Sequence, residues 1–254
     1  MKKTLVSMAI AGALGLGGAA QAAEYQDFTV DETPYGGTEI IADKMNGGYS
    51  EKITFDGGGN FVTNAYADFG QYFANEGTDE ILNSVINTGY DLYALFDATG
   101  AVVPLAPGIT QFNANSGSFN LYLDPNADTT KTLGATGADP VVLGNAGDDF
   151  LIAFASNMTS GTGLLVAGIG GFFDLVFNDF TLVDPDGKNF FIKPDPFYLI
   201  VNVDGDFDNF IVAGTQTVTG DVSAVFAVPE PGTIALLGMG LLGMGVAARR
   251  RKAA

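Results

Sequence analysis

The 254-residue chain contains no cysteine, no histidine and no tryptophan. The absence of cysteine excludes disulfides and thiolate chemistry, and the absence of histidine excludes Ser-His-Asp triads and His-Glu-x-x-His zinc sites. The G-x-S-x-G and S-x-x-K motifs of serine enzymes are missing as well. Only a carboxylate-based reaction such as glycoside hydrolysis stays open. We therefore expect a protein that is not an enzyme and that needs no cofactor, with calcium as the one ion left open.

Basic residues are scarce in the middle of the chain. Residues 23–227 hold five lysines and no arginine against 28 acidic residues, a net charge of −23. Phosphate recognition depends on lysine and arginine, so this segment is not expected to bind nucleic acid. The acidity suits divalent cations, cationic surfaces or solubility alone.

Residues 1–22 have the features of a secretory signal peptide. Lys2 and Lys3 precede an apolar stretch at residues 5–17, and Ala20 and Ala22 supply the small side chains that signal peptidase requires. Thirteen apolar residues are too few to cross a bilayer, which takes about 20 in a helix. We expect signal peptidase to cleave after Ala22 and the mature chain to be exported.

The C-terminal residues 228–254 have the order of a membrane sorting signal. A Pro-Glu-Pro tripeptide ends the regular structure before it, because proline cannot continue a strand or helix. A 17-residue apolar run at 232–248 follows, at the lower limit for a transmembrane helix, and a basic cluster then holds the end in the cytoplasm. The tripeptide is Pro229, Glu230 and Pro231, and the cluster begins with Arg249, Arg250 and Arg251.

This order resembles the sorting signal of PEP-CTERM proteins. In that family an exosortase cuts near the tripeptide and releases the protein from its temporary anchor in the inner membrane. The resemblance implies exosortase as a partner and a final location outside the cell or on its surface. An ordinary C-terminal membrane anchor is the alternative, with the same topology.

Residues 23–227 are predicted to form one all-β domain, a β-sandwich or jelly roll. Short runs of valine, isoleucine, phenylalanine, tyrosine and threonine are separated by glycine, asparagine, aspartate and proline. Phe119, Leu121 and Leu123 alternate with polar or amphipathic residues, as in a half-buried strand.

One short helix is predicted at residues 78–89. Thr78 can cap its first turn, and Gly89 can end it. The apolar residues recur at helical spacing and would form one face. They are Ile81, Leu82, Val85 and Ile86.

Asp204, Asp206 and Asp208 stand at alternate positions, which resembles the start of a calcium loop. An EF-hand is excluded, because Asn209 and Thr215 stand where that motif needs glycine and glutamate. A looser extracellular calcium loop remains open. The alternative, which we favour, is a polar turn between strands at 197–203 and 210–212.

Several short segments together resemble the flocculation-associated PEP-CTERM proteins of floc-forming bacteria. The resemblance implies a structural protein that supports cell aggregation, with exopolysaccharide or the cell surface as its partner. It supplies no catalytic or binding residues. A calcium-dependent carbohydrate-binding module and a carboxylate-dependent glycosidase are the alternatives. The segments are residues 28–32, 42–55, 92–96, 118–128, 205–210 and 214–216.

Overall fold

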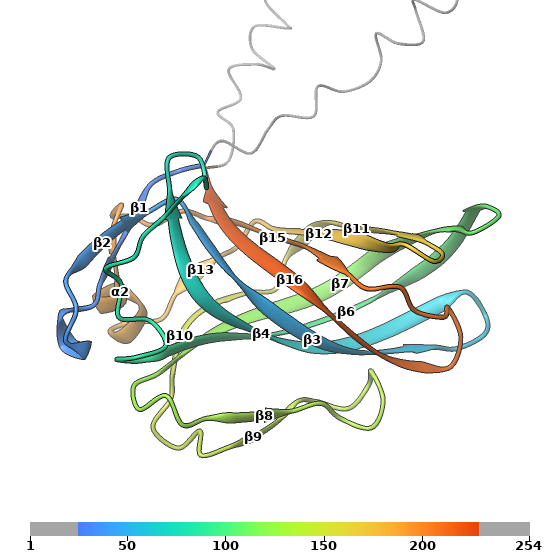
Figure 1. Cartoon of the computed structure of the whole chain (residues 1–254), viewed down its shortest axis with the longest axis horizontal. Helices are drawn as coiled ribbons and strands as arrows, with labels where there is room; N and C mark the ends of the chain where they lie inside the picture. The colour runs from blue at the N-terminus through green and yellow to red at the C-terminus, as the bar shows by residue number, and fades with distance from the viewer. Residues whose placement is uncertain (1–24, 229–254) are drawn as a thin grey trace, which may run out of the picture.

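The computed structural model describes residues 25–228, which form mainly antiparallel β-structure. Eight strands of the main sheet follow one another in the order β11-β12-β15-β16-β3-β4-β6-β7, and β7 pairs back onto β11, so the sheet is closed (Figure 1). These strands are β3 (Lys44–Phe55), β4 (Asn60–Ala74), β6 (Asp91–Ala106), β7 (Ile109–Asp124), β11 (Met158–Val166), β12 (Gly170–Phe177), β15 (Ile200–Phe207) and β16 (Thr215–Ala227).

Shorter strands extend this sheet. β10 (Phe150–Ala155) pairs with the C-terminal half of β7, where β7 has already left β11. β13 (Thr181–Leu182) pairs with β10, and β5 (Asp79–Glu80) pairs with the end of β4. The sheet therefore branches at β7, which contacts β11 with one half and β10 with the other.

One face of each long strand fills the interior of the closed sheet. Along β4, every second residue from Phe61 to Phe69 is buried. Phe119, Leu121 and Leu123 on β7 are buried in the same way, which confirms the alternation predicted for that strand. The apolar faces of the strands thus meet in one core.

A small second sheet lies at one end of the closed sheet. It has the order β14-β1-β2, with β1 (Phe28–Asp31), β2 (Glu39–Ala42) and β14 (Phe191–Lys193), and it is accompanied by the 3-10 turn η1 (Thr33–Tyr35) and the short helix α2 (Asp186–Phe190). The ring of Phe28 packs edge-on against Phe226 of β16, with centroids 5.1 Å apart. The first and the last strand of the described chain therefore meet at this end (Figure 1).

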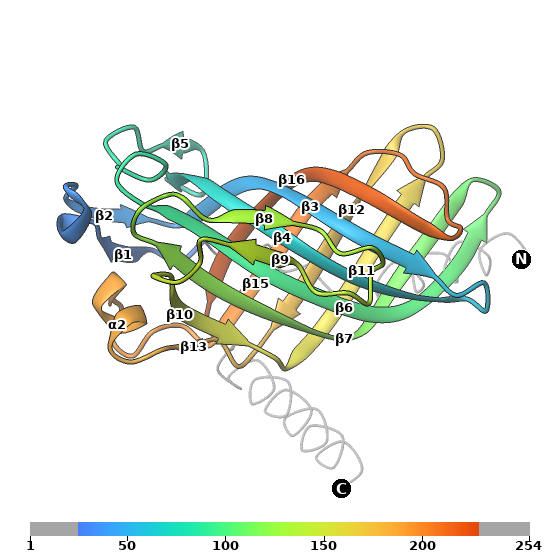
Figure 2. The ribbon, with the colours of Figure 1, turned by 90° about the horizontal axis from the view of Figure 1, so that it is seen from below.

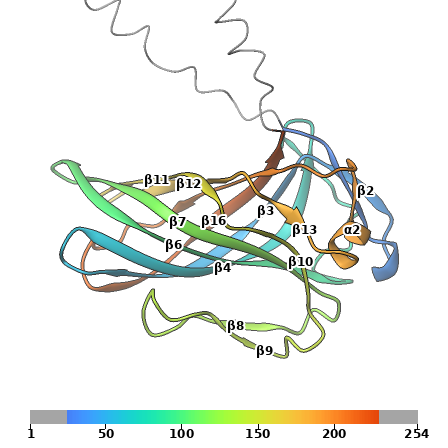
Figure 3. The same cartoon turned by 180° about the vertical axis from the view of Figure 1, so that it is seen from behind.

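A hairpin of β8 (Thr130–Thr132) and β9 (Val142–Gly144) lies along the outer face of the closed sheet (Figures 2 and 3). The amide of Val141 donates to Asn64 Oδ1 at 3.0 Å. Lys131 forms an ion pair of 2.8 Å with Asp68 of β4, and its ammonium group lies over the ring of Tyr93. Polar contacts therefore fix this hairpin to β4 and β6.

The all-β expectation is confirmed, but the sandwich or jelly roll is not what forms. The long strands within residues 25–228 build one closed sheet in place of two stacked ones. β4, β6 and β7 are 15 or 16 residues long and each pairs with its neighbour in the chain, so the twisted sheet curls until β7 meets β11. Strands of a sandwich and strands of a closed sheet both bury every second residue, so the sequence pattern does not distinguish the two architectures.

The helix predicted at residues 78–89 does not form. Asp79 and Glu80 pair with β4 as strand β5, and Leu82 is 84% exposed. Asn87 has a positive φ of 64°, which an α-helix does not allow. The carboxylate of Glu32 accepts hydrogen bonds from the Ser84 hydroxyl and the Val85 amide, so tertiary contacts override the local helical pattern.

Within residues 25–228, no helix is long and apolar enough to cross a membrane. The predicted signal peptide and the predicted sorting helix lie outside the described residues.

Candidate functional site

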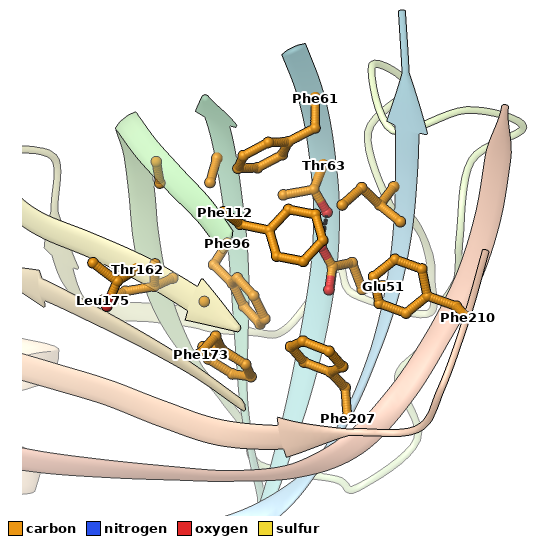
Figure 4. A pocket seen from close by; sticks show the side chains of 14 residues that line it. Glu51, Phe61, Thr63, Phe96, Phe112, Thr162, Phe173, Leu175, Phe207 and Phe210 are labelled. Atoms are coloured by element: carbon orange, nitrogen blue, oxygen red, sulfur yellow. Dashed lines mark hydrogen bonds between the residues drawn. The ribbon is translucent and has the colours of Figure 1, made fainter. Parts of the chain in front are cut away.

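The closed sheet contains a cavity near the end of the molecule opposite the small sheet. Its volume is about 60 Å³, and Figure 4 shows aromatic side chains arranged around a single carboxylate. All seven strands that contribute to it also contribute to the apolar core. The lining residues are Glu51, Ile53, Phe61, Thr63, Phe96, Ala98, Phe112, Ala114, Thr162, Gly163, Phe173, Leu175, Phe207 and Phe210.

Glu51 points into this cavity because its side chain lies on the inward face of β3. Tyr49 and Ile53, two residues away on either side, are buried in the core, and Glu51 shares their face of the strand. It stands opposite Val218 of β16 and Ala65 of β4. The register of the sheet therefore places a carboxylate among apolar side chains.

The environment of Glu51 favours its neutral form. Its carboxylate accepts a hydrogen bond from the Thr63 hydroxyl. Burial raises the pKa of Glu51 to about 7, while this hydrogen bond lowers it in part. The side chain still has some accessible surface, because it faces the cavity and not close-packed atoms. Near neutral pH the carboxyl group is thus poised between its charged and neutral forms.

Phenylalanine rings form the walls around Glu51. Phe61 packs edge-on against Phe112 at a centroid distance of 5.8 Å. Phe96 and Phe173 lie 6.4 Å apart in a stacked arrangement. These rings come from β4, β6, β7 and β12, so the whole fold is needed to assemble the wall.

The segment 208–214 between β15 and β16 supplies the last part of the wall. Its Phe210 lies 5.4 Å from Phe207 and 6.0 Å from Phe112 between ring centroids. Asn209 Oδ1 accepts a hydrogen bond of 2.7 Å from the Gly168 amide, which ties the segment to the turn between β11 and β12. Ile211 is 70% exposed on the outside of this segment.

The predicted calcium residues lie elsewhere. Asp204 and Asp206 belong to β15, which runs without a break to Phe207, so the turn favoured from the sequence is not present. Both side chains face outward, since Val203 and Phe207 occupy the buried face. Asp208 follows the strand end, and its amide donates to the Thr219 carbonyl.

Asp204 and Asp206 contact different neighbours. Asp204 stands directly opposite Asp174 of β12, and its pKa is raised by burial and by the charge of Asp174. Asp206 Oδ1 accepts a hydrogen bond from the Asp221 amide at 3.1 Å. Between residues 25 and 228 there is no group of three or more acidic side chains placed to hold a metal ion. Calcium binding stays a prediction, without a preformed cluster at these three residues.

Glu51 and Thr63 were not among the residues singled out from the sequence. A signal was present, because Tyr49, Glu51, Ile53 and Phe55 alternate with polar residues, as along one face of a strand. A charged residue in the apolar phase of a strand is unusual and marks a buried carboxylate. The side chains around this carboxylate come from other strands, so the sequence near Glu51 does not predict them.

One of the two predicted processing signals matches a known family. Ala20 and Ala22, the tripeptide 229–231 and the arginines 249–251 all lie outside the described residues. Residues 227–252 match the family described as the PEP-CTERM protein-sorting motif. The chain carries a PEP-CTERM sorting signal. This signal supports export, processing by exosortase and C-terminal cleavage at the cell surface.

Other comparisons add little to the PEP-CTERM match. No curated protein sequence matches the chain. A solved structure, the attachment invasion locus protein Ail of Yersinia pestis, aligns with 72% of this chain and 95% of its own at 10% identity. The TM-score is 0.17, so the alignment carries no argument about fold or function.

Proposed function

We propose that this PEP-CTERM protein is a non-enzymatic structural component of the extracellular matrix that supports cell aggregation together with exopolysaccharide. The observation that carries the proposal is the sorting signal at residues 227–252, which supports release outside the cell. The resemblance of several segments to flocculation-associated proteins supports the specific role. The net charge of −23 in the exported part also favours a soluble matrix component over a nucleic-acid partner.

The arrangement of the fold is compatible with this role. β16 is the strand that leads to the sorting signal, and it ends beside β1. Before cleavage, the membrane anchor would therefore join the domain at this end. The strand ends and loops at the other end carry exposed apolar residues, including Leu105, Ile169 and Ile211. A tethered molecule would therefore present these loops away from its anchor. Exposed apolar side chains grouped in this way are typical of interaction surfaces.

Deleting the gene should leave polysaccharide synthesis intact and make the cells grow dispersed. The reason is that the protein is proposed to link cells to the polymer and not to make it. Polymer yield and floc size are measured together in the deletion strain and in a strain complemented with the full chain. Normal flocs in the deletion strain would refute the structural role. Altered polymer length, with hydrolytic activity in the purified protein, would favour a glycosidase.

A further inference from the structure

The cavity inside the closed sheet combines one carboxylate with six phenylalanine rings. We propose that it is a binding site for a small alkylammonium ion, held between the Glu51 carboxylate and the surrounding aromatic side chains. This inference is independent of the role in cell aggregation, because it rests only on the interior of the domain.

Glu51 has no cationic partner within the described part of the chain. The ion pairs among residues 25–228 are Lys131 with Asp68 and Lys188 with Asp184, both on the outside. Thr63 is the one hydrogen-bond donor to the Glu51 carboxylate among these residues. A carboxylate removed from water is costly unless a cation or several donors compensate it. A bound cation would supply that compensation.

The aromatic walls favour an organic cation over a metal ion. The faces of aromatic rings attract alkylammonium groups, and such cages are a recurrent way of binding them. Calcium takes six to eight oxygen ligands, whereas the side-chain oxygens lining this cavity come from Glu51, Thr63 and Thr162 alone. Figure 4 shows the ring of Phe210 beside Glu51 and that of Phe207 below it, where they would contact the methyl groups of a ligand.

The size of the cavity limits the ligand. A bound water needs roughly 15 Å³ of such volume, so 60 Å³ has room for about four non-hydrogen atoms. Trimethylammonium has that size and can donate its single N–H to the carboxylate. A larger amine would have to displace Phe210 and the segment 208–214 that carries it.

Binding should depend on pH through Glu51. The other lining residues, on β4, β6, β7, β11, β12, β15 and the 208–214 segment, are not titratable. Tyr49, two residues away on β3, is ionisable, but its pKa is raised by burial and by the charges of Glu51, Asp206 and Asp208, so it stays neutral. Below pH 7 the affinity for a cation should fall about tenfold per pH unit, and above pH 7 it should level off.

The experiment titrates the exported protein, purified from the cell surface or the growth medium, with trimethylammonium chloride. Binding is followed by ligand-observed NMR and by calorimetry between pH 5.5 and pH 8.5, a range chosen around the value of about 7 for Glu51. Glu51→Gln keeps the shape of the side chain and removes its charge, so affinity at the high end should fall about tenfold or more. The matched control is Glu39→Gln, which removes one charge from an exposed position on β2.

The outcomes separate the proposal from its rivals. Binding that is lost in Glu51→Gln and kept in Glu39→Gln supports the site. Equal binding by both variants, or no binding in the millimolar range, overturns it. Equal affinity for 2-propanol, a neutral molecule with as many non-hydrogen atoms as trimethylammonium, would show a merely apolar cavity and also overturns it.

The stability of Glu51→Gln provides a check that needs no ligand. The folded pKa of Glu51 lies above its usual value of 4.5, so folding is progressively disfavoured as the pH rises from there to about 7. Wild type should therefore lose stability relative to Glu51→Gln across this interval, and the difference should stay constant above it. A difference that does not change with pH would contradict a carboxylate desolvated in the cavity.

Discussion

Replacing Phe226 with alanine is expected to lower the free energy of unfolding by about 3–5 kcal/mol. Phe226 is completely buried at the end of β16. Its ring lies 5.1 Å from Phe28, 5.0 Å from Phe180 and 5.1 Å from Phe197 between centroids. Its removal would leave a cavity where the closed sheet meets the small sheet, and both would lose contacts. Urea unfolding followed by circular dichroism measures the change.

Phe172→Ala is the matched control for this prediction. Phe172 is also a strand phenylalanine, but it lies on the outer face of β12 and is 53% exposed. Its replacement should change the free energy of unfolding by about 0.5 kcal/mol at most. If the two variants were equally stable, the junction between the two sheets would not be a central part of the fold.

Replacing Glu32 with alanine is expected to cost about 3 kcal/mol. Glu32 is fully buried, and its carboxylate accepts hydrogen bonds from the Ser84 hydroxyl at 2.5 Å, the Val85 amide at 3.0 Å and the Tyr90 hydroxyl at 2.8 Å. The Tyr90 hydroxyl also forms a hydrogen bond of 3.0 Å with the hydroxyl of Tyr72. Removal of the carboxylate leaves buried donors without an acceptor, which is the most costly way to lose a hydrogen bond.

The measurement for Glu32 combines unfolding with amide hydrogen exchange. The Val85 amide should exchange faster in Glu32→Ala, because its hydrogen-bond acceptor is gone. Glu39→Ala, at an exposed position on β2, is the control and should leave both quantities unchanged. Unchanged exchange at Val85 in Glu32→Ala would show that the segment is fixed by other contacts.

The sequence predicted secondary structure where the pattern was local. Phe119, Leu121 and Leu123 alternate with polar neighbours, and a strand with one buried face results. At residues 81–86 the apolar spacing was equally suggestive of a helix. There the outcome depends on Glu32, which is some 50 residues away and cannot be linked to Ser84 by any local rule.

For the same reason, the sequence did not predict that the sheet closes or which side chains line the cavity. Both depend on pairing between β7 and β11, whose register joins Asn113 to Thr162. The position of Glu51 in the apolar phase of its strand was visible in the sequence, but the rings around it were not. Asp204 and Asp206 show the opposite limit. Their alternate spacing was interpreted as a possible calcium loop, but a strand with an acidic outer face has the same spacing.

The most direct test of the account is the mass of the protein recovered outside the cell. Cleavage by exosortase at the PEP-CTERM signal predicts a chain that begins at residue 23 and ends near Val228. Such a chain lacks the three arginines at 249–251. Mass spectrometry of the intact protein, with peptide mapping of both ends, decides the matter. A surface protein that keeps Arg249, Arg250 and Arg251 would contradict the account and show an ordinary membrane anchor.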